Sequence, residues 1–327
     1  MLPVVIPLVT FAAAVLLTGC LVPVLHRVQL MDVPNARSSH ARPVPRGGGL
    51  AVMAAVVFGV AMTALIDVDR VDRAVLVVVG VALALAAVGF ADDRSSLSSR
   101  SRLAAQIVAA VAVVALSATL GTAGVPGLVF WAVSLVAVVG YVNAYNFMDG
   151  INGISSFTGA VAGLWWLWQG GVHDVAQAQV LGAVVLGAML GFAPWNVPVA
   201  RIFLGDVGSY GIGLLIVATS VLGWAGGAPA LVAVAPLVVY GADTGWVLIK
   251  RARDGRRIGE AHREHVYQRL VDGGWSHPAS ALLCAGASAA VCLSVALAPW
   301  PVAVALSAGC VMAYLCVPRI AGREVSV

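Results

Sequence analysis

The sequence predicts an all-α integral membrane protein with about eleven transmembrane helices, built as a single multi-span domain over residues 1–327. Hydrophobic residues make up 61% of the chain and charged residues only 10%, against about a quarter charged in soluble proteins. The apolar residues gather into eleven segments, each close to the roughly 20 residues that cross a bilayer. The connections between these segments are short, which leaves no room for a separate soluble domain.

The expected spans follow one another with few residues between them. They are Val4–Leu25, Gly49–Ile66, Ala74–Ala91, Leu103–Leu120, Leu128–Tyr145, Ile154–Gly171, Val175–Ala193, Val207–Trp224, Ala228–Ile249, Ala279–Ala298 and Val302–Val317. The last two are separated only by Pro299–Trp300–Pro301. No basic region precedes the first span, so we expect it to be retained and not cleaved as a signal peptide.

Charge predicts the orientation. Alternating connections put every Lys and Arg of the 19 on one side, except Arg70 and Arg73. The positive-inside rule makes that side cytoplasmic, with the N-terminus outside and the C-terminus in the cytoplasm. Every candidate catalytic group lies in the inner connections or the adjoining span ends, which predicts an active site at the cytoplasmic face.

The five cysteines lie in apolar spans without metal-ligand or disulfide spacing and are expected to pack in the interior.

The first inner connection contains Arg37, His40 and Arg46 among prolines and glycines, which predict an irregular, fairly rigid segment. Its basic groups could reach the other inner connections.

Two adjacent carboxylates, Asp92 and Asp93, end the third expected span. Consecutive helical side chains project about 100° apart, so one could face a metal or phosphate while the other faces the bundle. A solvated helix end is the alternative. Arg94, Arg100 and Arg102 follow, and could bind phosphate or only anchor the cytoplasmic side.

The segment from Asn143 to Gly153 carries three Asn, one Asp and two Gly at a membrane edge. If the helix continues, Asn143, Asn146 and Asp149 share a face. Amide and carboxylate oxygens suit Mg²⁺, which takes few protein ligands and completes its shell with water and phosphate. A polar turn between helices is the alternative.

A Gly-rich start opens the eighth span, between Arg201 and Ser209. Free backbone N–H groups and the helix dipole there predict an anion site, although Asp206 could simply cap the helix. Capping does not explain Arg201 and Phe203 just upstream, whereas a phosphate and an aromatic base would.

The most basic inner connection contains His262, Arg263, Glu264 and His265. The two histidines, three residues apart, would share a helix face, and a zinc protease would need them four apart. Arg with two His suits a diphosphate or sugar phosphate, and a solvated basic loop is the alternative.

Asp243, within the ninth span, should face the bundle because an ionised Asp in the bilayer costs about 2.5–3.5 kcal/mol. It could serve chemistry or only join helices.

Taken in order, DxPxxRxxHxxPxPRGG, the DD pair, NxxNFMDGINGI, FLGDVGS and HREH resemble the polyprenyl-phosphate N-acetylhexosamine-1-phosphate transferase superfamily, glycosyl transferase family 4. The resemblance runs from about Asp32 to Arg269. The RSSH, NFMDG and AHREHVYQRL stretches are most similar to the branch that starts O-antigen and related surface glycans.

The resemblance implies transfer of HexNAc-1-phosphate from a UDP-N-acetylhexosamine to undecaprenyl or decaprenyl phosphate, which yields polyprenyl-diphosphate-HexNAc and UMP. It also implies Mg²⁺ or Mn²⁺ as cofactor, a multi-pass location in a bacterial inner membrane, and no nucleic-acid partner. A homodimer is compatible with it.

Site residues carried over by the resemblance fall into three groups. Asp206 and Asn146 would hold the metal, supported by Asp149. Asp92 or Asp93 would deprotonate or orient the lipid phosphate, which Arg102 would hold. The substrate-binding group is Arg37, His40, Arg46, Asn143, Asn152, Asn196, Phe203, His262, Arg263 and His265, in which the HREH residues bind the sugar diphosphate, Phe203 stacks on uracil and Asn196 reads its edge. A structural role for Asn196 in its loop is the alternative.

The chain departs from the family pattern at two positions. Asn152 stands where many relatives carry an Asp, which favours a binding role there over a general base. Ser38 replaces a Lys that is common elsewhere, so Arg37 or Arg42 would supply that phosphate contact.

Three alternatives remain at this stage. The translocase that handles UDP-MurNAc-pentapeptide belongs to the same superfamily. A secondary transporter would place polar groups near mid-membrane, often in inverted repeats, and a non-catalytic lipid-phosphate binder would not need the metal motif.

The orientation can be tested with single cysteines in a cysteine-free background. Probes at Ser98 and Gly255 should react with an impermeant thiol reagent only after the inner face is opened, whereas probes at Asp69 and His173 should react from outside. Labelling of Ser98 from outside would contradict the orientation.

Overall fold

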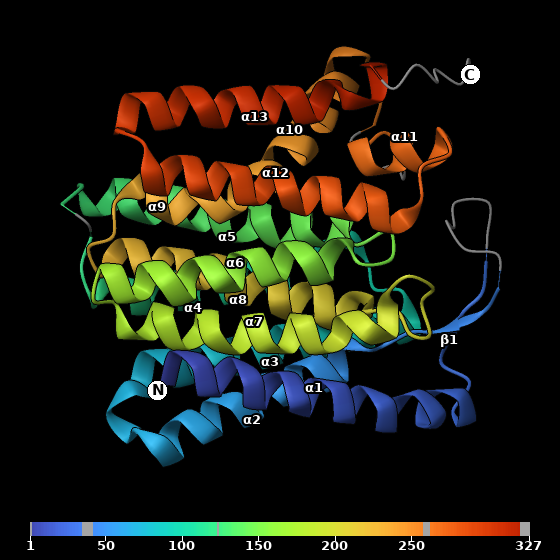
Figure 1. Ribbon diagram of the computed structural model, residues 1–327, viewed down its shortest axis with the longest axis horizontal. Coiled ribbons are helices and arrows are strands. Elements are labelled where there is room, and N and C mark those ends of the chain that lie inside the picture. The colour runs from blue at the N-terminus through green and yellow to red at the C-terminus, as the bar shows by residue number, and fades with distance from the viewer. Residues whose placement is uncertain (1, 35–41, 123, 258–261, 321–327) are drawn as a thin grey trace.

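The computed structural model describes residues 2–34, 42–122, 124–257 and 262–320. Figure 1 shows long helices lying side by side, with short connections at both ends. The first helices are α1 (Leu2–Arg27), α2 (Gly49–Ile66), α3 (Arg73–Ser95), α4 (Ser99–Ala118), α5 (Gly127–Met148), α6 (Ile154–Val172) and α7 (Ala176–Asn196). The remaining helices are α8 (Gly205–Ala225), α9 (Ala230–Val234), α10 (Val238–Arg253), α11 (Val266–Asp272), α12 (His277–Leu297) and α13 (Trp300–Ile320). Two 3₁₀ turns, Val68–Arg70 and Ala235–Leu237, and an antiparallel pair, β1 (Met31–Asp32) with β2 (Val44–Pro45), complete the described elements.

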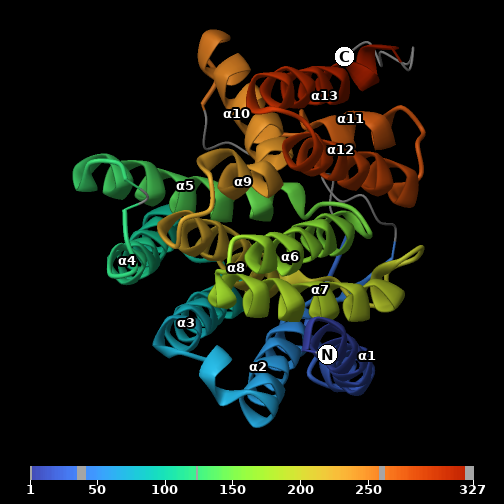
Figure 2. The same ribbon diagram turned by 60° about the vertical axis from the view of Figure 1, so that its left-hand side comes forward.

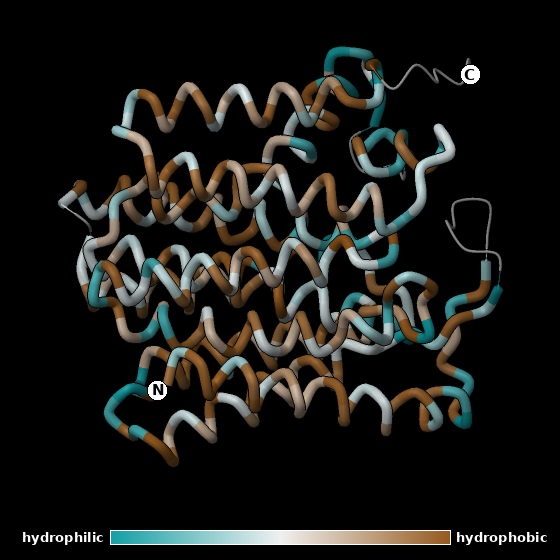
Figure 3. The backbone as a smooth tube through the Cα atoms, in the orientation of Figure 1, coloured by the Kyte–Doolittle hydropathy of each residue, from teal (hydrophilic) through white to brown (hydrophobic). Residues whose placement is uncertain are grey.

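The all-α membrane architecture is confirmed. Over the described residues, ten helical segments are long and apolar enough to cross a membrane. The sixth expected span corresponds to the helix α6, which is not among these ten segments. Figure 3 shows the apolar residues along the helices and the hydrophilic ones mainly toward their ends.

The ninth expected span is not one continuous helix. It consists of α9, the 3₁₀ turn Ala235–Leu237 and α10. Pro236 stands in the turn, where its missing N–H and fixed φ interrupt the regular helix. In Figure 2, α10 extends away from the layers formed by α5, α6 and α8.

Helix α8 lies at the centre of the bundle. Only Asp206 and Trp224 among its residues are not fully buried, and it packs against α2, α3, α5 and α7. Close approach depends on glycine: a Cβ at Gly89 of α3 would collide with the Asp206 carbonyl, and one at Gly49 would collide with the backbone of Gly208. These two contacts fix the start of α8 against α2 and α3.

The connections that were predicted to face the cytoplasm gather at one end of the bundle. In Figure 1 the β1 region and α11, which are far apart in sequence, both lie at the right-hand end. A parallel bridge pairs Arg46, after β2, with Phe203, before α8. The predicted motifs therefore share one end.

The glycine contact can be tested with a matched pair of substitutions on α3. Gly89→Ala should lower the free energy of unfolding by about 1–3 kcal/mol, because the added methyl overpacks against α8. Gly80→Ala, where nothing lies within 4 Å of the added Cβ, should be neutral or stabilising by up to about 1 kcal/mol. Thermal unfolding in detergent measures both, and equal stability of the two variants would contradict the packing argument.

Candidate active site

The Asp93 carboxylate binds the first turn of α8. Its two oxygens accept hydrogen bonds from the backbone N–H groups of Asp206 (3.0 Å) and Val207 (3.1 Å). Gly205 precedes them with φ +75°, a conformation that side chains rarely adopt. The sequence predicted that this helix start would bind a substrate anion. That prediction is wrong for these two N–H groups, because a carboxylate of the chain itself already occupies them.

Arg46 links this carboxylate to a second one. Its Nε lies 2.6 Å from Asp93 Oδ1, and its Nη2 lies 3.0 Å from Asp206 Oδ1. Backbone pairing holds Arg46 there, since the N–H of Phe203 donates to the Pro45 carbonyl at 2.8 Å. The guanidinium was expected to bind substrate, but in this structure it is shared between the two carboxylates. Phe203 is half-buried and forms a backbone bridge with Arg46. The predicted contact of Phe203 with uracil stays a prediction.

Asn146 approaches Asp206 from the end of α5. Its Nδ2 donates to Asp206 Oδ1 at 2.9 Å and to Ser209 Oγ at 2.8 Å. Both bonds use the amide nitrogen and direct it toward α8. The Asp206 carboxylate therefore contacts both Arg46 and Asn146.

Asp92 interacts with Asp206 but also has partners of its own. Arg102 Nη1 lies 3.2 Å and the Tyr210 hydroxyl 3.1 Å from Asp92 Oδ2, while the Leu97 N–H donates to Oδ1 at 2.7 Å. The two adjacent carboxylates therefore diverge as the helical geometry predicted. Asp92 ties α3 to α4 and α8, and it holds Arg102, the residue expected to bind the lipid phosphate.

Asp149 lies just beyond α5, where Ser155 Oγ donates to its Oδ1 at 2.6 Å. Burial raises the pKa of its carboxyl to about 7, and the negative charge of Asp206 acts in the same direction. The Ser155 hydrogen bond and Arg46 oppose this increase. Asp149, Asp206, Asp93 and Arg46 thus form one electrostatic cluster at the ends of α3, α5 and α8.

The other three asparagine predictions fare differently. Asn143 turns to α4, where its Nδ2 donates to Gln106 Oε1 at 2.6 Å, so it does not share the environment of Asn146. Asn152 donates to the Pro198 carbonyl at 3.0 Å. Asn196 accepts from the Gly153 N–H at 2.6 Å and donates to the Ile202 carbonyl at 3.0 Å. Both ends of its buried amide join two loops, which favours the structural role over direct contact with uracil.

The HREH segment is anchored on Asp243. His265 Nδ1 lies 3.1 Å from Asp243 Oδ1, and Asp243 Oδ2 accepts from the Val266 N–H (3.1 Å) and the Tyr314 hydroxyl (2.9 Å). Asp243 therefore joins α10, α11 and α13, as the helix-joining alternative predicted. His265 is buried and so holds this segment in place, which does not fit direct binding of the diphosphate through Nδ1.

His262 is the more available histidine. It precedes α11 in irregular structure, so the predicted common helix face with His265 is wrong, although their ring centroids are 5.1 Å apart. Its Nδ1 has no hydrogen-bond partner within the described part of the chain. Burial, then His265 and Arg251, lower the pKa of its imidazole. Arg263 contacts Asp272 at 2.6 Å.

Helix α11 carries this segment against the end of α5. The Tyr267 hydroxyl donates to the Phe147 carbonyl at 3.0 Å. A Cβ at Gly150 would collide with that same hydroxyl, which explains the glycine after Asp149. The HREH segment and the carboxylate cluster are thereby held next to one another.

Two predicted site residues, Arg37 and His40, lie outside the described residues. Conversely, Ser209, Tyr210 and Gln106 contact site residues but were not predicted. Ser209 and Tyr210 follow Asp206 on the same helix start, which was a usable signal. Gln106 had none, because a single polar residue inside an apolar span does not indicate its partner.

Comparison with known proteins places these features in a family. Residues 75–224 match the family model for "Glycosyl transferase family 4". The chain is 30% identical over 286 residues to the decaprenyl-phosphate N-acetylglucosaminephosphotransferase of Mycolicibacterium smegmatis, covering 76% of this chain and 70% of that protein. It is 28% identical to the probable undecaprenyl-phosphate N-acetylglucosaminyl 1-phosphate transferase of Bacillus subtilis, with 84% and 80% covered. A phospho-N-acetylmuramoyl-pentapeptide-transferase of Kocuria rhizophila matches 51 residues at 41% identity, 16% of this chain and 14% of that protein.

The raised pKa of Asp149 predicts how stability changes with pH. Between its ordinary value near 3.8 and about 7, the folded protein binds the proton and the unfolded chain releases it, so stability falls as pH rises through this window. Asp149→Asn removes the charge and keeps the acceptor for Ser155. In metal-free buffer, its melting temperature should exceed that of the wild type by more at pH 8 than at pH 5.

The control is Asp254→Asn, at a half-exposed position in the loop after α10. It should show no such pH-dependent difference. A gap between Asp149→Asn and wild type that is constant with pH would contradict a raised pKa at Asp149.

Proposed function

Since the chain belongs to glycosyl transferase family 4, we infer that it transfers N-acetylglucosamine-1-phosphate from UDP-N-acetylglucosamine to a polyprenyl phosphate. The relatives that cover most of the chain are named for this activity with undecaprenyl or decaprenyl phosphate. An oxygen of the lipid phosphate attacks the phosphorus next to the sugar. The bond from that phosphorus to the bridging oxygen breaks, and UMP leaves.

The observation that carries this function is the convergence of Arg46, Asp93, Asp206 and Asn146 from four separate stretches of sequence. Phosphoryl transfer needs positioning and charge neutralisation more than covalent chemistry. A compact cluster of carboxylates, an amide and a guanidinium supplies these, and it is where the family motifs meet.

The donor chemistry fits Mg²⁺, which we propose as cofactor, with Mn²⁺ as a substitute. Within the described residues, no group of three or more His, Cys, Asp or Glu could hold a metal. Mg²⁺ needs only one or two carboxylates and takes its other ligands from water and substrate phosphates. Asp206 and Asn146 would hold it, and bound there it would neutralise charge on the diphosphate.

The remaining residues act around this centre. Arg102, held by Asp92, would receive the lipid phosphate, and Asp93 would orient the reacting groups through Arg46. His262 and Arg263 would meet the sugar diphosphate, while His265, Asn152 and Asn196 position the loops. Asn143 would hold α5 in place through its hydrogen bond with Gln106 of α4.

We propose that this end of the bundle faces the cytoplasm of a bacterial plasma membrane, with eleven spans and the N-terminus outside. Nucleotide-sugar donors are charged and cannot cross the bilayer unaided, so the donor site must open on the side where they are made. We also propose that the reaction starts the synthesis of a surface glycan such as O-antigen. The protein is further proposed to form a homodimer.

Product analysis tests the function directly. The purified protein should release UMP from UDP-N-acetylglucosamine only when polyprenyl phosphate is present, and should form the lipid-diphosphate-sugar. Chelation of divalent cations should stop it, and Mg²⁺ should restore it. Turnover with UDP-MurNAc-pentapeptide and none with UDP-N-acetylglucosamine would assign the chain to the translocase reaction instead.

The metal-binding role predicts a specific effect of Asp206→Asn. Loss of a carboxylate from a cation with few protein ligands should reduce turnover on the order of 100-fold or more and raise the Mg²⁺ concentration needed for half-maximal activity. Asp254→Asn should change neither. Near-normal turnover and an unchanged Mg²⁺ requirement in Asp206→Asn would contradict this assignment.

A further inference from the structure

A second polar site lies apart from the carboxylate cluster, between α10, α11 and α13. It is a cavity of about 380 Å³ lined by Trp246, Val247, Lys250, Glu264, Arg269 and Arg319. That volume falls within the range of small-ligand sites, about 300–1,000 Å³. None of the transfer chemistry described above uses Lys250, Arg269 or Arg319.

Three cations and one carboxylate line this cavity. Lys250 Nζ lies 3.1 Å from Glu264 Oε2, but Glu264 is also bound by Arg251 at 2.7 Å. Its charge is therefore shared with a guanidinium outside the cavity lining. No acidic partner for Arg269 or Arg319 is found among the described residues. The cavity carries an excess of positive charge.

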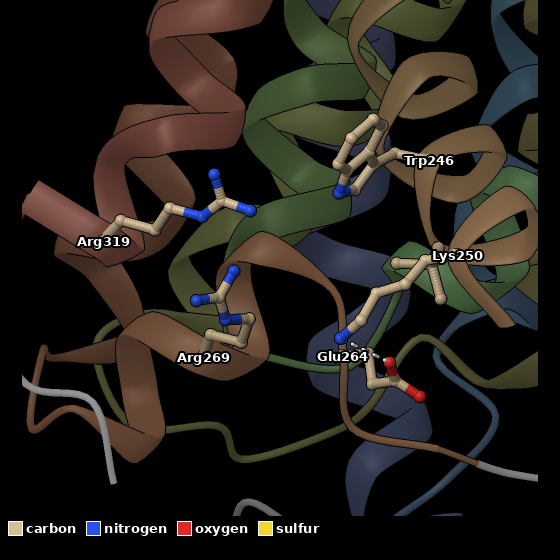
Figure 4. Close-up of a pocket in the computed structure, with 6 residues that line it drawn as sticks. Trp246, Lys250, Glu264, Arg269 and Arg319 are labelled. Atoms are coloured by element: carbon tan, nitrogen blue, oxygen red, sulfur yellow. Dashed lines mark hydrogen bonds and ion pairs between the residues drawn. The ribbon is translucent and has the colours of Figure 1, made fainter. Parts of the chain in front are cut away.

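Figure 4 shows how these cations are arranged. The guanidinium groups of Arg269, from α11, and Arg319, from α13, turn toward one another, while Lys250 points to Glu264. Like charges that converge without a carboxylate between them repel, and an anion placed between them removes that repulsion. Guanidinium pairs favour phosphate in particular, because their N–H groups match its oxygens.

The surroundings of the cavity are apolar. The Trp246 ring forms one wall and is 44% exposed. Ile249 and Ile320, the sequence neighbours of Lys250 and Arg319, are 51% and 79% exposed. Tryptophan is typical of the headgroup level of a bilayer, and basic pockets between membrane helices bind lipid headgroups. A soluble anion would gain nothing from this apolar rim, whereas acyl chains would cover it.

We propose that this cavity binds the phosphate headgroup of a membrane lipid, with Arg269 and Arg319 on the phosphate and the acyl chains against Trp246, Ile249 and Ile320. This site differs from the one that positions the reacting phosphates, and it does not depend on the transfer reaction. The lipid is a phospholipid of the surrounding leaflet or the polyprenyl phosphate held outside the active site, since both present the same group.

Lipid binding to the delipidated full chain tests the proposal, measured by native mass spectrometry in titrations with phosphatidylglycerol, phosphatidylcholine and polyprenyl phosphate. Phosphatidylglycerol should bind more tightly than phosphatidylcholine. A basic residue near an anionic lipid contributes about 1 kcal/mol, or about five-fold in affinity. Arg269→Gln/Arg319→Gln should therefore weaken binding about 25-fold.

The matched control is Arg27→Gln/Arg253→Gln, which removes two exposed cations from the ends of α1 and α10. It should leave lipid affinity unchanged. An equal loss in both pairs would show general surface charge and overturn the proposal, as would no loss in either pair.

Two further arms identify the ligand. Preference of the wild type for polyprenyl phosphate, with the same sensitivity to the double substitution, would name the acceptor as the lipid. Inorganic phosphate that binds with that sensitivity and displaces both lipids would overturn a lipid site. If the double variant does not fold, Arg319→Gln carries the test alone, with about five-fold weaker binding expected against none for Arg253→Gln.

Discussion

The arrangement of the candidate active site depends on a single carboxylate, that of Asp93, bound between the first turn of α8 and Arg46. It receives two backbone N–H groups and a guanidinium, so its charge is compensated although it is largely removed from water. Hydrogen bonds to charged groups contribute about 1.5–3 kcal/mol each. This interaction joins the connection after β2, the end of α3 and the start of α8. The close contacts at Gly49 and Gly89 are what allow those backbones to come near enough.

The electrostatics of this end follow from that interaction. Arg46 is shared between Asp93 and Asp206, so one positive charge faces two carboxylates, and Asp149 adds a third negative group that feels Asp206. Such a surplus repels a diphosphate unless a cation accompanies it. The charge count of the cluster therefore supports the proposed divalent cation, as does the type of its ligands. The raised pKa of Asp149 comes mainly from burial, and the negative charge of Asp206 acts in the same direction.

Most of the fold could be predicted because apolar length and charge asymmetry are local properties of the sequence. The helices and the meeting of the motifs at one end were correctly expected on that basis. Pairings across the structure could not be predicted in the same way. Nothing in the sequence indicates that Asp93 would occupy the N–H groups after Gly205, or that both ends of the Asn196 amide would be used by Gly153 and Ile202. Polar residues near a ligand site and polar residues that hold its loops have the same composition, and only their partners distinguish them. Pro236 indicates the break between α9 and α10, but the strongly apolar residues around it favoured the prediction of one continuous span.

The segment with the two histidines shows how a buried charge can organise a loop at a distance. Asp243 uses its two oxygens on His265, the Val266 N–H and Tyr314, which fixes the start of α11 relative to α10 and α13. Tyr267, the second residue of α11, donates to the Phe147 carbonyl near the end of α5. Glu264, immediately before His265, is held by Lys250 and the buried Arg251. An anion bound next to Lys250 would compete with Glu264 for that ammonium group, and Glu264 is covalently adjacent to the histidine that Asp243 holds. The basic cavity and the HREH segment therefore share one carboxylate, which Arg251 also holds independently of Lys250.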